Sequence, residues 1–201
     1  MKQFPLLLIA LASIALGVWF GLQSADEKEN PYAHLGGDFT LQSDQGPVSL
    51  NDFHGKVVVL YFGYTRCPDV CITALSKVAQ AMRTLDENER EQIQPIFVSI
   101  DPERDTPKIA SEYARYFYPG AIGLSGSPEE IAKVAKRYLV IYEKVPMKDS
   151  AMDYSMDHSS IIYIIGQDGK IRSLVHHADT AEALVKYLRE TLAGTLPKKP
   201  A

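Results

Sequence analysis

Residues 61–74 read YFGYTRCPDVCITA, and this stretch decides the fold that we expect. The apolar, β-branched run at residues 57–62 predicts a buried strand that ends at Gly63, where a turn begins. An apolar helical pattern then runs from Val70 to Leu85. Both cysteines of the chain lie in the turn and the start of this helix. The stretch therefore predicts a strand-to-helix connection that presents two thiols.

The two cysteines, Cys67 and Cys71, have the spacing C-x-x-x-C. If Cys71 lies in the first helical turn, both sulfurs point to the same face of the helix. Unpaired backbone N–H groups and the positive end of the helix dipole favour thiolates there. A structural disulfide is the weaker explanation, because closing so short a loop adds little stability. The pair predicts a site for a soft metal ion or a redox-active dithiol.

The rest of the chain repeats strands and helices around this connection. Residues 94–100 (QPIFVSI) predict a second buried strand, and Thr106-Pro107 opens a helix. Residues 127–130 (SPEE) form a capping box that opens another helix. Two strands around Gln167-Asp168-Gly169 predict a hairpin, and a last helix begins at Thr180. This order predicts an α/β, thioredoxin-like fold with a mixed central sheet flanked by helices.

Two local details follow from the same patterns. Residues 38–43 and 48–53 predict two short strands around the turn Gln45-Gly46-Pro47. In the helix after Pro107, large apolar residues share one predicted face: Ile109, Tyr113, Tyr116 and Phe117.

The N-terminus carries an uncharged stretch, residues 4–22 (FPLLLIALASIALGVWFGL), of about the length that crosses a bilayer as a helix. A lysine precedes it and acidic residues follow, which predicts that the N-terminus stays in the cytoplasm. We expect a single-pass anchor in the inner (cytoplasmic) membrane, with the folded body on the outer, periplasmic side. The alternative is a signal peptide cleaved near Ser24 or Ala25. Either reading exports the body.

Composition bounds the remaining possibilities. A chain of 201 residues with 46% hydrophobic content allows one well-packed domain and a small extra segment. A net charge of −4 offers no basic surface for nucleic acid, so we exclude that class of partner. The predicted divisions are an anchor or uncleaved signal (1–25), a linker (26–37), a thioredoxin-like domain (38–193) and a tail (194–201).

A third metal ligand must come from elsewhere in the chain. Two thiolates leave a coordination position open on a soft metal such as Cu(I), zinc or an iron–sulfur centre. Among five histidines, His158 is our candidate, because it lies on a loop just before the strand at 160–165, which this fold can bring over the cysteine helix. Carboxylates nearby, Asp153 and Asp157, can orient its ring. The alternative is a surface histidine or a satisfied core histidine.

Two further groups of residues leave alternatives open. Three methionines crowd one approach to His158: Met147, Met152 and Met156. Their thioethers are soft enough to contact Cu(I) transiently, but methionines also simply pack. Asp101 and Arg104, together with Asp69, form either a partner-docking surface or ordinary turn and cap residues.

Three separated blocks resemble the Sco/SenC family of copper-binding cytochrome c oxidase assembly proteins. GYTRCPDVC at 63–71 is similar to the family's cysteine motif, SIDPERDTP at 99–107 to its second block, and DHS at 157–159 to its histidine block. The resemblance implies that Cys67, Cys71 and His158 coordinate one copper ion. It also implies that the two thiols can cycle to a disulfide.

The function that this resemblance implies is that of a copper chaperone, which is not an enzyme in the strict sense. The chaperone would pass copper by ligand exchange to the binuclear copper site of a cytochrome c oxidase subunit. The alternative is a thiol–disulfide oxidoreductase, with Cys67 and Cys71 as the redox-active pair, that reduces the cysteines of the acceptor. A peroxidase of similar fold is a weaker reading, because peroxide reduction does not require the second cysteine.

Overall fold

The computed structural model describes residues 12–19, 30–147 and 152–195. The chain divides into two units, Met1–His34 and Leu35–Ala201. In the first unit, residues 12–19 form a helix. Within the described ranges, no helix is both long and apolar enough to span a bilayer. Most of the predicted anchor at 4–22 lies outside those ranges, so the anchor, the linker and the other divisions stay predictions.

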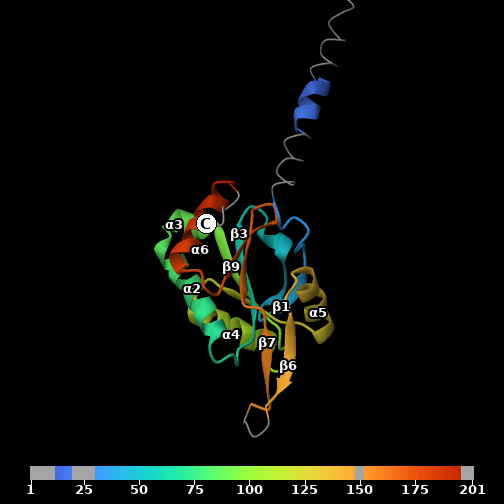
Figure 1. Cartoon of the computed structure of the whole chain (residues 1–201), viewed down its shortest axis with the longest axis vertical. Coiled ribbons are helices and arrows are strands. Elements are labelled where there is room, and N and C mark those ends of the chain that lie inside the picture. The colour runs from blue at the N-terminus through green and yellow to red at the C-terminus, as the bar shows by residue number, and fades with distance from the viewer. Residues whose placement is uncertain (1–11, 20–29, 148–151, 196–201) are drawn as a thin grey trace, which may run out of the picture. The chain divides into compact units, whose positions relative to one another are not determined.

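The centre of the second unit is a five-stranded sheet with the order β5-β4-β3-β8-β9. Figure 1 labels two of its strands, β3 and β9. Strands β3, β4 and β5 run parallel to one another. Strand β8 runs antiparallel to both of its neighbours, β3 and β9. The strand bounds are β3 Val57–Gly63, β4 Ile93–Ser99, β5 Ile122–Leu124, β8 Ile161–Ile165 and β9 Ile171–His176. Every residue of β3 is buried, as a strand covered on both faces requires. The predicted mixed α/β sheet is confirmed.

Helices cover both faces of this sheet. Their bounds are α2 Val70–Thr84, α3 Glu87–Glu91, α4 Pro107–Phe117, α5 Pro128–Arg137 and α6 Ala181–Leu192. In Figure 1, α2, α4 and α6 lie to the left of the sheet and α5 to its right. The predicted starts of α4, α5 and α6 are confirmed, because Thr106, Ser127 and Thr180 each accept a hydrogen bond from a first-turn N–H.

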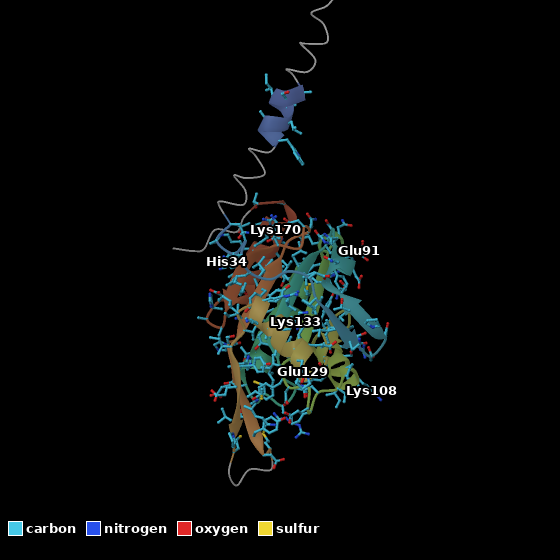
Figure 2. All side chains as sticks on the ribbon, turned by 90° about the vertical axis from the view of Figure 1, so that its right-hand side faces the viewer. His34, Glu91, Lys108, Glu129, Lys133 and Lys170 are labelled. Atoms are coloured by element: carbon cyan, nitrogen blue, oxygen red, sulfur yellow. The ribbon has the colours of Figure 1, made fainter. Side chains whose placement is uncertain are left out.

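The face that α5 turns to solvent is charged. Figure 2 views the molecule from the side of α5 and labels Glu129 and Lys133, both of which are exposed. The opposite side of the helix buries Ile131, Val134 and Ala135. This is the pattern of an amphipathic helix that packs on a sheet.

The predicted strand at 48–53 is wrong in its second half. The structure has a separate hairpin of β1 (Thr40–Ser43) and β2 (Gly46–Ser49), followed by a 3-10 helix at Leu50–Phe53. Ser49 and Asp52 form a reciprocal capping box around this turn. The local side-chain bonds therefore favour a helical turn over a longer strand.

The predicted apolar face of α4 is correct only in part. Tyr113 packs against Phe97 and Phe117, whereas Ile109 is 40% and Tyr116 83% exposed. The fully buried residues of the helix are small: Ala110, Ser111 and Ala114. The helix lies so close to β5 that a Cβ on Gly123 would be 2.0 Å from the carbonyl oxygen of Ala110. Only small side chains fit between the two backbones.

Sequence patterns missed the short helix α3 and a second hairpin, β6 (Tyr142–Pro146) with β7 (Tyr154–His158). Only residues 146–158 of this segment are predicted as a loop, and no element is predicted for the strand before them, because the charged residues and proline weaken the strand signal. The hairpin extends away from the central sheet in Figure 1. His158 is the last residue of β7 and pairs with Tyr142, so it lies on a strand rather than on the predicted loop.

Candidate metal centre

Three elements bring Cys67, Cys71 and His158 together. Cys67 lies in the turn after β3, Cys71 is the second residue of α2, and His158 ends β7. Their ligating atoms all lie within 4.8 Å of one another. Among the described residues, no other group of three histidine, cysteine or acidic side chains comes so close. Two sulfurs and one imidazole nitrogen are a donor set that suits a soft metal ion.

The start of α2 holds the Cys67 sulfur in place. The backbone N–H of Cys71 donates to Cys67 Sγ over 3.4 Å. Asp69 occupies the N-cap position but makes no capping bond with its side chain. The sulfur of Cys67 therefore accepts one of the N–H groups that a helix leaves unpaired at its start. This position also favours a negative charge on the sulfur.

The two thiols differ in acidity. The hydrogen bond with Cys71 is the main cause that holds the pKa of Cys67 well below its usual range. The same bond to Cys67, together with burial, raises the pKa of Cys71. These opposite directions favour Cys67 as the first of the two thiols to ionise.

The imidazole of His158 is held by a backbone carbonyl. Its Nδ1 lies 3.1 Å from the carbonyl oxygen of Ser159, and its Nε2 lies 3.3 Å from Cys71 Sγ. Because a carbonyl can only accept, Nδ1 carries the proton and the lone pair of Nε2 faces the sulfurs. The expectation that carboxylates orient this ring is wrong, since Ser159 does so and Asp157 is exposed.

Two buried tyrosines pack against His158. The ring centroids of Tyr61 and Tyr64 lie 6.3 and 5.9 Å from that of His158, both edge-on. Their hydroxyls bond to Ser160 at 3.0 Å and to Ser155 at 3.2 Å. Burial raises the pKa of both phenols, so they stay neutral beside the thiolate. Sequence reasoning placed neither tyrosine in the site, although both lie in the cysteine stretch.

Gly63 makes room for one of the sulfurs. A Cβ at this position would lie 2.8 Å from Cys71 Sγ. The backbone carbonyl of Gly63 also accepts from the N–H of Ile100 at 2.8 Å, which fixes the end of β3 against β4. A side chain here would displace a candidate ligand, and no sequence pattern signalled that contact.

A buried cluster fastens the β6–β7 hairpin to the end of β4. Arg104 forms an ion pair with Asp101 and donates to the carbonyl oxygens of Met152 and Tyr154 at 3.1 and 2.9 Å. The Tyr154 hydroxyl donates to Asp101 at 2.7 Å, and the guanidinium lies 3.6 Å from the centroid of the Tyr154 ring. These contacts position the strand that carries His158.

Two expectations about neighbouring residues have different outcomes. Asp101 is 3% exposed and the Arg104 side chain 10%, so the prediction that they form a docking surface is wrong. Asp69 alone of that group is exposed.

Among the methionines, Met156 is buried and Met147 is 40% exposed. Transient contact of the methionines with copper stays a prediction.

Comparison with known proteins identifies the family. The SCO1/SenC family model matches residues 27–193. The chain belongs to the SCO1/SenC family. The mitochondrial SCO2 homolog of Bos taurus is 38% identical over 201 residues, covering 94% of this chain and 75% of the bovine protein. The SCO2-like protein of Rickettsia felis is 33% identical over 187 residues, covering 88% and 91%. The resemblance stated from the three blocks is confirmed.

Solved structures of SCO1/SenC proteins agree with this fold. Arabidopsis thaliana ScoI with copper bound aligns with a TM-score of 0.74 and 38% identity, covering 80% of this chain and 99% of that one. Bradyrhizobium japonicum ScoI with copper bound aligns with a TM-score of 0.70 and 40% identity, covering 79% and 99%. Two copper-bound relatives therefore share the fold that brings the three side chains together.

Proposed function

We propose that this SCO1/SenC chain binds one copper ion through Cys67, Cys71 and His158 and delivers it to the copper-site subunit of cytochrome c oxidase. The observation that carries the proposal is the convergence of two sulfurs and one imidazole nitrogen within 4.8 Å. The copper-bound ScoI proteins, which share fold and family with this chain, support copper as the metal. Two thiolates with one imidazole also match the preference of Cu(I) for soft ligands.

Loading copper would release a proton from the site. The bond to Cys67 and burial both raise the pKa of Cys71, which favours the protonated thiol before the metal binds. A cysteine ligates as the thiolate, so this proton leaves when the metal binds. Copper affinity therefore falls as the pH falls.

Burial of the ligands suggests an order for transfer. Cys71 is 0% exposed and Cys67 5%, whereas His158 is partly exposed. An acceptor would reach the copper from the side of His158 and replace this ligand first. Exchange of one ligand at a time keeps the metal bound throughout, and Cys71 releases it last.

Support for the oxidase as partner comes from the family. BsSco is described as a member of the Sco family of cytochrome c oxidase assembly proteins. At 24% identity, its likeness to this chain shows the fold alone. Membership of the SCO1/SenC family rests on the family match instead, and the oxidase subunit is our proposal for the acceptor.

A second candidate function is reduction of the acceptor's cysteines. Both thiols are free, and the pKa of Cys67 lies well below its usual range. The Cys67 thiolate would attack an acceptor disulfide, and Cys71, on losing its proton, would then attack the mixed disulfide. The products are two acceptor thiols and a Cys67–Cys71 disulfide, so electrons and sulfur bonds balance.

Copper titration of the reduced protein separates these functions. We expect one tightly bound copper per wild-type chain, and loss or clear weakening of binding in His158→Ala. The matched control is His54→Ala. His54 precedes the start of β3 whereas Cys67 follows its end, and the His54 ring bonds only to Asn51 among the described residues. Dithiol activity that survives in His158→Ala, together with no copper binding by the wild type, would favour the reductase.

We further propose that residues 4–22 anchor the chain in the inner membrane, with the copper-binding domain on the outer side. The uncharged length of this stretch and the charges around it support the proposal. Membrane fractionation and protease accessibility of the domain in intact spheroplasts test it. Recovery of the full-length chain in the soluble fraction would contradict it.

A further inference from the structure

Asp105 is a buried carboxylate that accepts hydrogen bonds from two segments of the chain. It is 1% exposed. The Thr65 hydroxyl donates to Oδ1 at 2.5 Å, and the Thr65 backbone N–H donates to Oδ2 at 2.9 Å. The Ser99 hydroxyl also donates to Oδ2, at 2.6 Å. The carboxylate therefore joins the cysteine turn to the end of β4.

Every partner of this carboxylate is a hydrogen-bond donor. Within the described part of the chain, no lysine or arginine forms an ion pair with Asp105. A buried carboxylate is costly unless donors surround it, and an ionised one can only accept. The site is therefore built for an acidic side chain, and the desolvation cost of Asp105 is offset through the bonds to Thr65 and Ser99.

The backbone of Asp105 is itself held from two sides. Its N–H donates to the carbonyl oxygen of Asp101 at 2.9 Å, and its carbonyl oxygen accepts from the Ser125 hydroxyl at 2.6 Å. Asp101 belongs to the cluster that fastens the β6–β7 hairpin. These backbone bonds fix the position of Asp105 between the cysteine turn and the strand that ends at His158.

We propose that Asp105 is a positioning residue for the metal centre, which fixes the turn from Gly63 to Cys67 and so the place of the Cys67 sulfur. This inference rests on the proposed copper-binding function. Thr65 is two residues before Cys67, and Asp105 holds both its backbone N–H and its hydroxyl. Ligand positions in a metal site tolerate errors of only about 0.2 Å. Holding the turn at two points therefore helps to keep the Cys67 sulfur at the position that the metal requires.

The first test measures the access of reagent to Cys67 without copper. Cys67 is 5% exposed, so a thiol reagent reaches it only when the turn opens. We would measure the rate at which iodoacetamide alkylates Cys67 in the reduced full-length chain as a function of pH. The variants are compared by the rate on the plateau at high pH, where the thiol is fully ionised. Asp105→Ala and Thr65→Val should raise the plateau rate about tenfold, the ratio expected when bonds that close the turn are lost.

Ser125→Ala is the matched control. It also removes a buried hydroxyl that bonds to Asp105, but its partner is the backbone carbonyl and not the carboxylate. Its alkylation rate should stay within about twofold of the wild type, since the turn keeps both bonds. Equal rates in Thr65→Val and Ser125→Ala would overturn the proposal. If Asp105→Ala fails to fold, Thr65→Val carries the comparison.

Asp105→Asn separates positioning from charge. Asparagine keeps an oxygen for the Thr65 N–H, and the Thr65 hydroxyl can rotate to accept from the amide. Positioning by hydrogen bonds therefore predicts that asparagine restores most of what alanine loses. An asparagine variant as reactive as the alanine variant would overturn the proposal, because the charge would then be what matters.

Copper release from the same variants distinguishes this inference from the proposed function. We expect Thr65→Val to release Cu(I) to a chelator faster than Ser125→Ala does. A wild-type chain that binds no copper would remove the proposed function but leave the alkylation result standing. A chain that binds copper normally, with equal alkylation rates in all variants, would remove only the role of Asp105.

Discussion

Gly63→Ala tests how closely the fold is fitted to the Cys71 sulfur. The new Cβ would lie 2.8 Å from Cys71 Sγ, whereas ordinary contact begins at 3.4 Å. The difference, 3.4 − 2.8 = 0.6 Å, is the least distance by which the sulfur and the new methyl group must separate. A metal ligand tolerates about 0.2 Å, so this separation misplaces Cys71 for a metal shared with Cys67 and His158.

We expect copper affinity to fall about 10- to 100-fold in this variant, the range seen when groups that support metal ligands are changed. Overpacking should also lower the free energy of unfolding by about 1–3 kcal/mol. Competition with a chromogenic Cu(I) chelator measures the affinity, and urea unfolding of the metal-free chain measures the stability.

The control for Gly63→Ala is Gly120→Ala, where a Cβ would lie 2.9 Å from a ring carbon of Tyr118. The nearest distance is similar and no residue of the metal centre takes part, but the clash is milder, because Gly120 is exposed and meets only the Tyr118 ring. We expect a stability loss there with unchanged copper affinity. If Gly63→Ala binds copper as tightly as the wild type, the reasoning from sulfur placement is refuted.

Three other predictions concern the hairpin, the thiols and a methionine. Tyr154→Phe removes the hydroxyl that bonds to buried Asp101; it should cost about 1–3 kcal/mol and speed amide exchange across the hairpin, as mass spectrometry would show. Folding lowers the pKa of Cys67, so its thiolate stabilises the metal-free fold fully above the ordinary thiol pKa, and this stability is lost as the pH falls through the lowered value. Cys71→Ala removes the chief cause, so the pKa of Cys67 read from thiolate absorbance should rise and this pH dependence of unfolding should shrink. Met147→Leu should slow copper loading without changing the bound stoichiometry, and unchanged stopped-flow kinetics would contradict the role of this exposed thioether.

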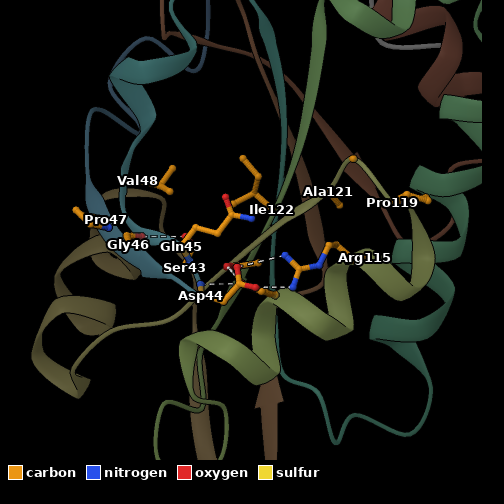
Figure 3. Close-up of a pocket in the computed structure, with 13 residues that line it drawn as sticks. Ser43, Asp44, Gln45, Gly46, Pro47, Val48, Arg115, Pro119, Ala121 and Ile122 are labelled. Atoms are coloured by element: carbon orange, nitrogen blue, oxygen red, sulfur yellow. Dashed lines mark hydrogen bonds and ion pairs between the residues drawn. The ribbon is translucent and has the colours of Figure 1, made fainter.

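A pocket lies away from the metal centre, and its charged side chains pair with each other. Figure 3 shows it between the β1–β2 hairpin and the end of α4, with Asp44 and Arg115 facing each other. The two side chains form a bidentate ion pair at 3.2 and 2.6 Å. Each of these two charges therefore has a partner within the pocket itself.

Short-range features of this protein could be read from the sequence. Thr106, Ser127 and Thr180 cap their helices through hydrogen bonds to residues three positions away. Both partners of each bond therefore lie within one short stretch of sequence. The same holds for the buried strand β3 and for Cys71 in the first turn of α2. His158 was a candidate by topology, and the family resemblance strengthened it.

Long-range contacts decided the rest. Cys71 and His158 are 87 residues apart in sequence, and Thr65 and Asp105 are 40 apart. The buried face of α4 depends on how closely β5 approaches it, and Asp101 and Arg104 became a buried anchor only because the hairpin folds over them. The sequence by itself determined the strand, the turn and the two thiols, because those depend on local backbone preferences. The tertiary structure decided which distant side chains complete the site, because that depends on the packing of every element between them.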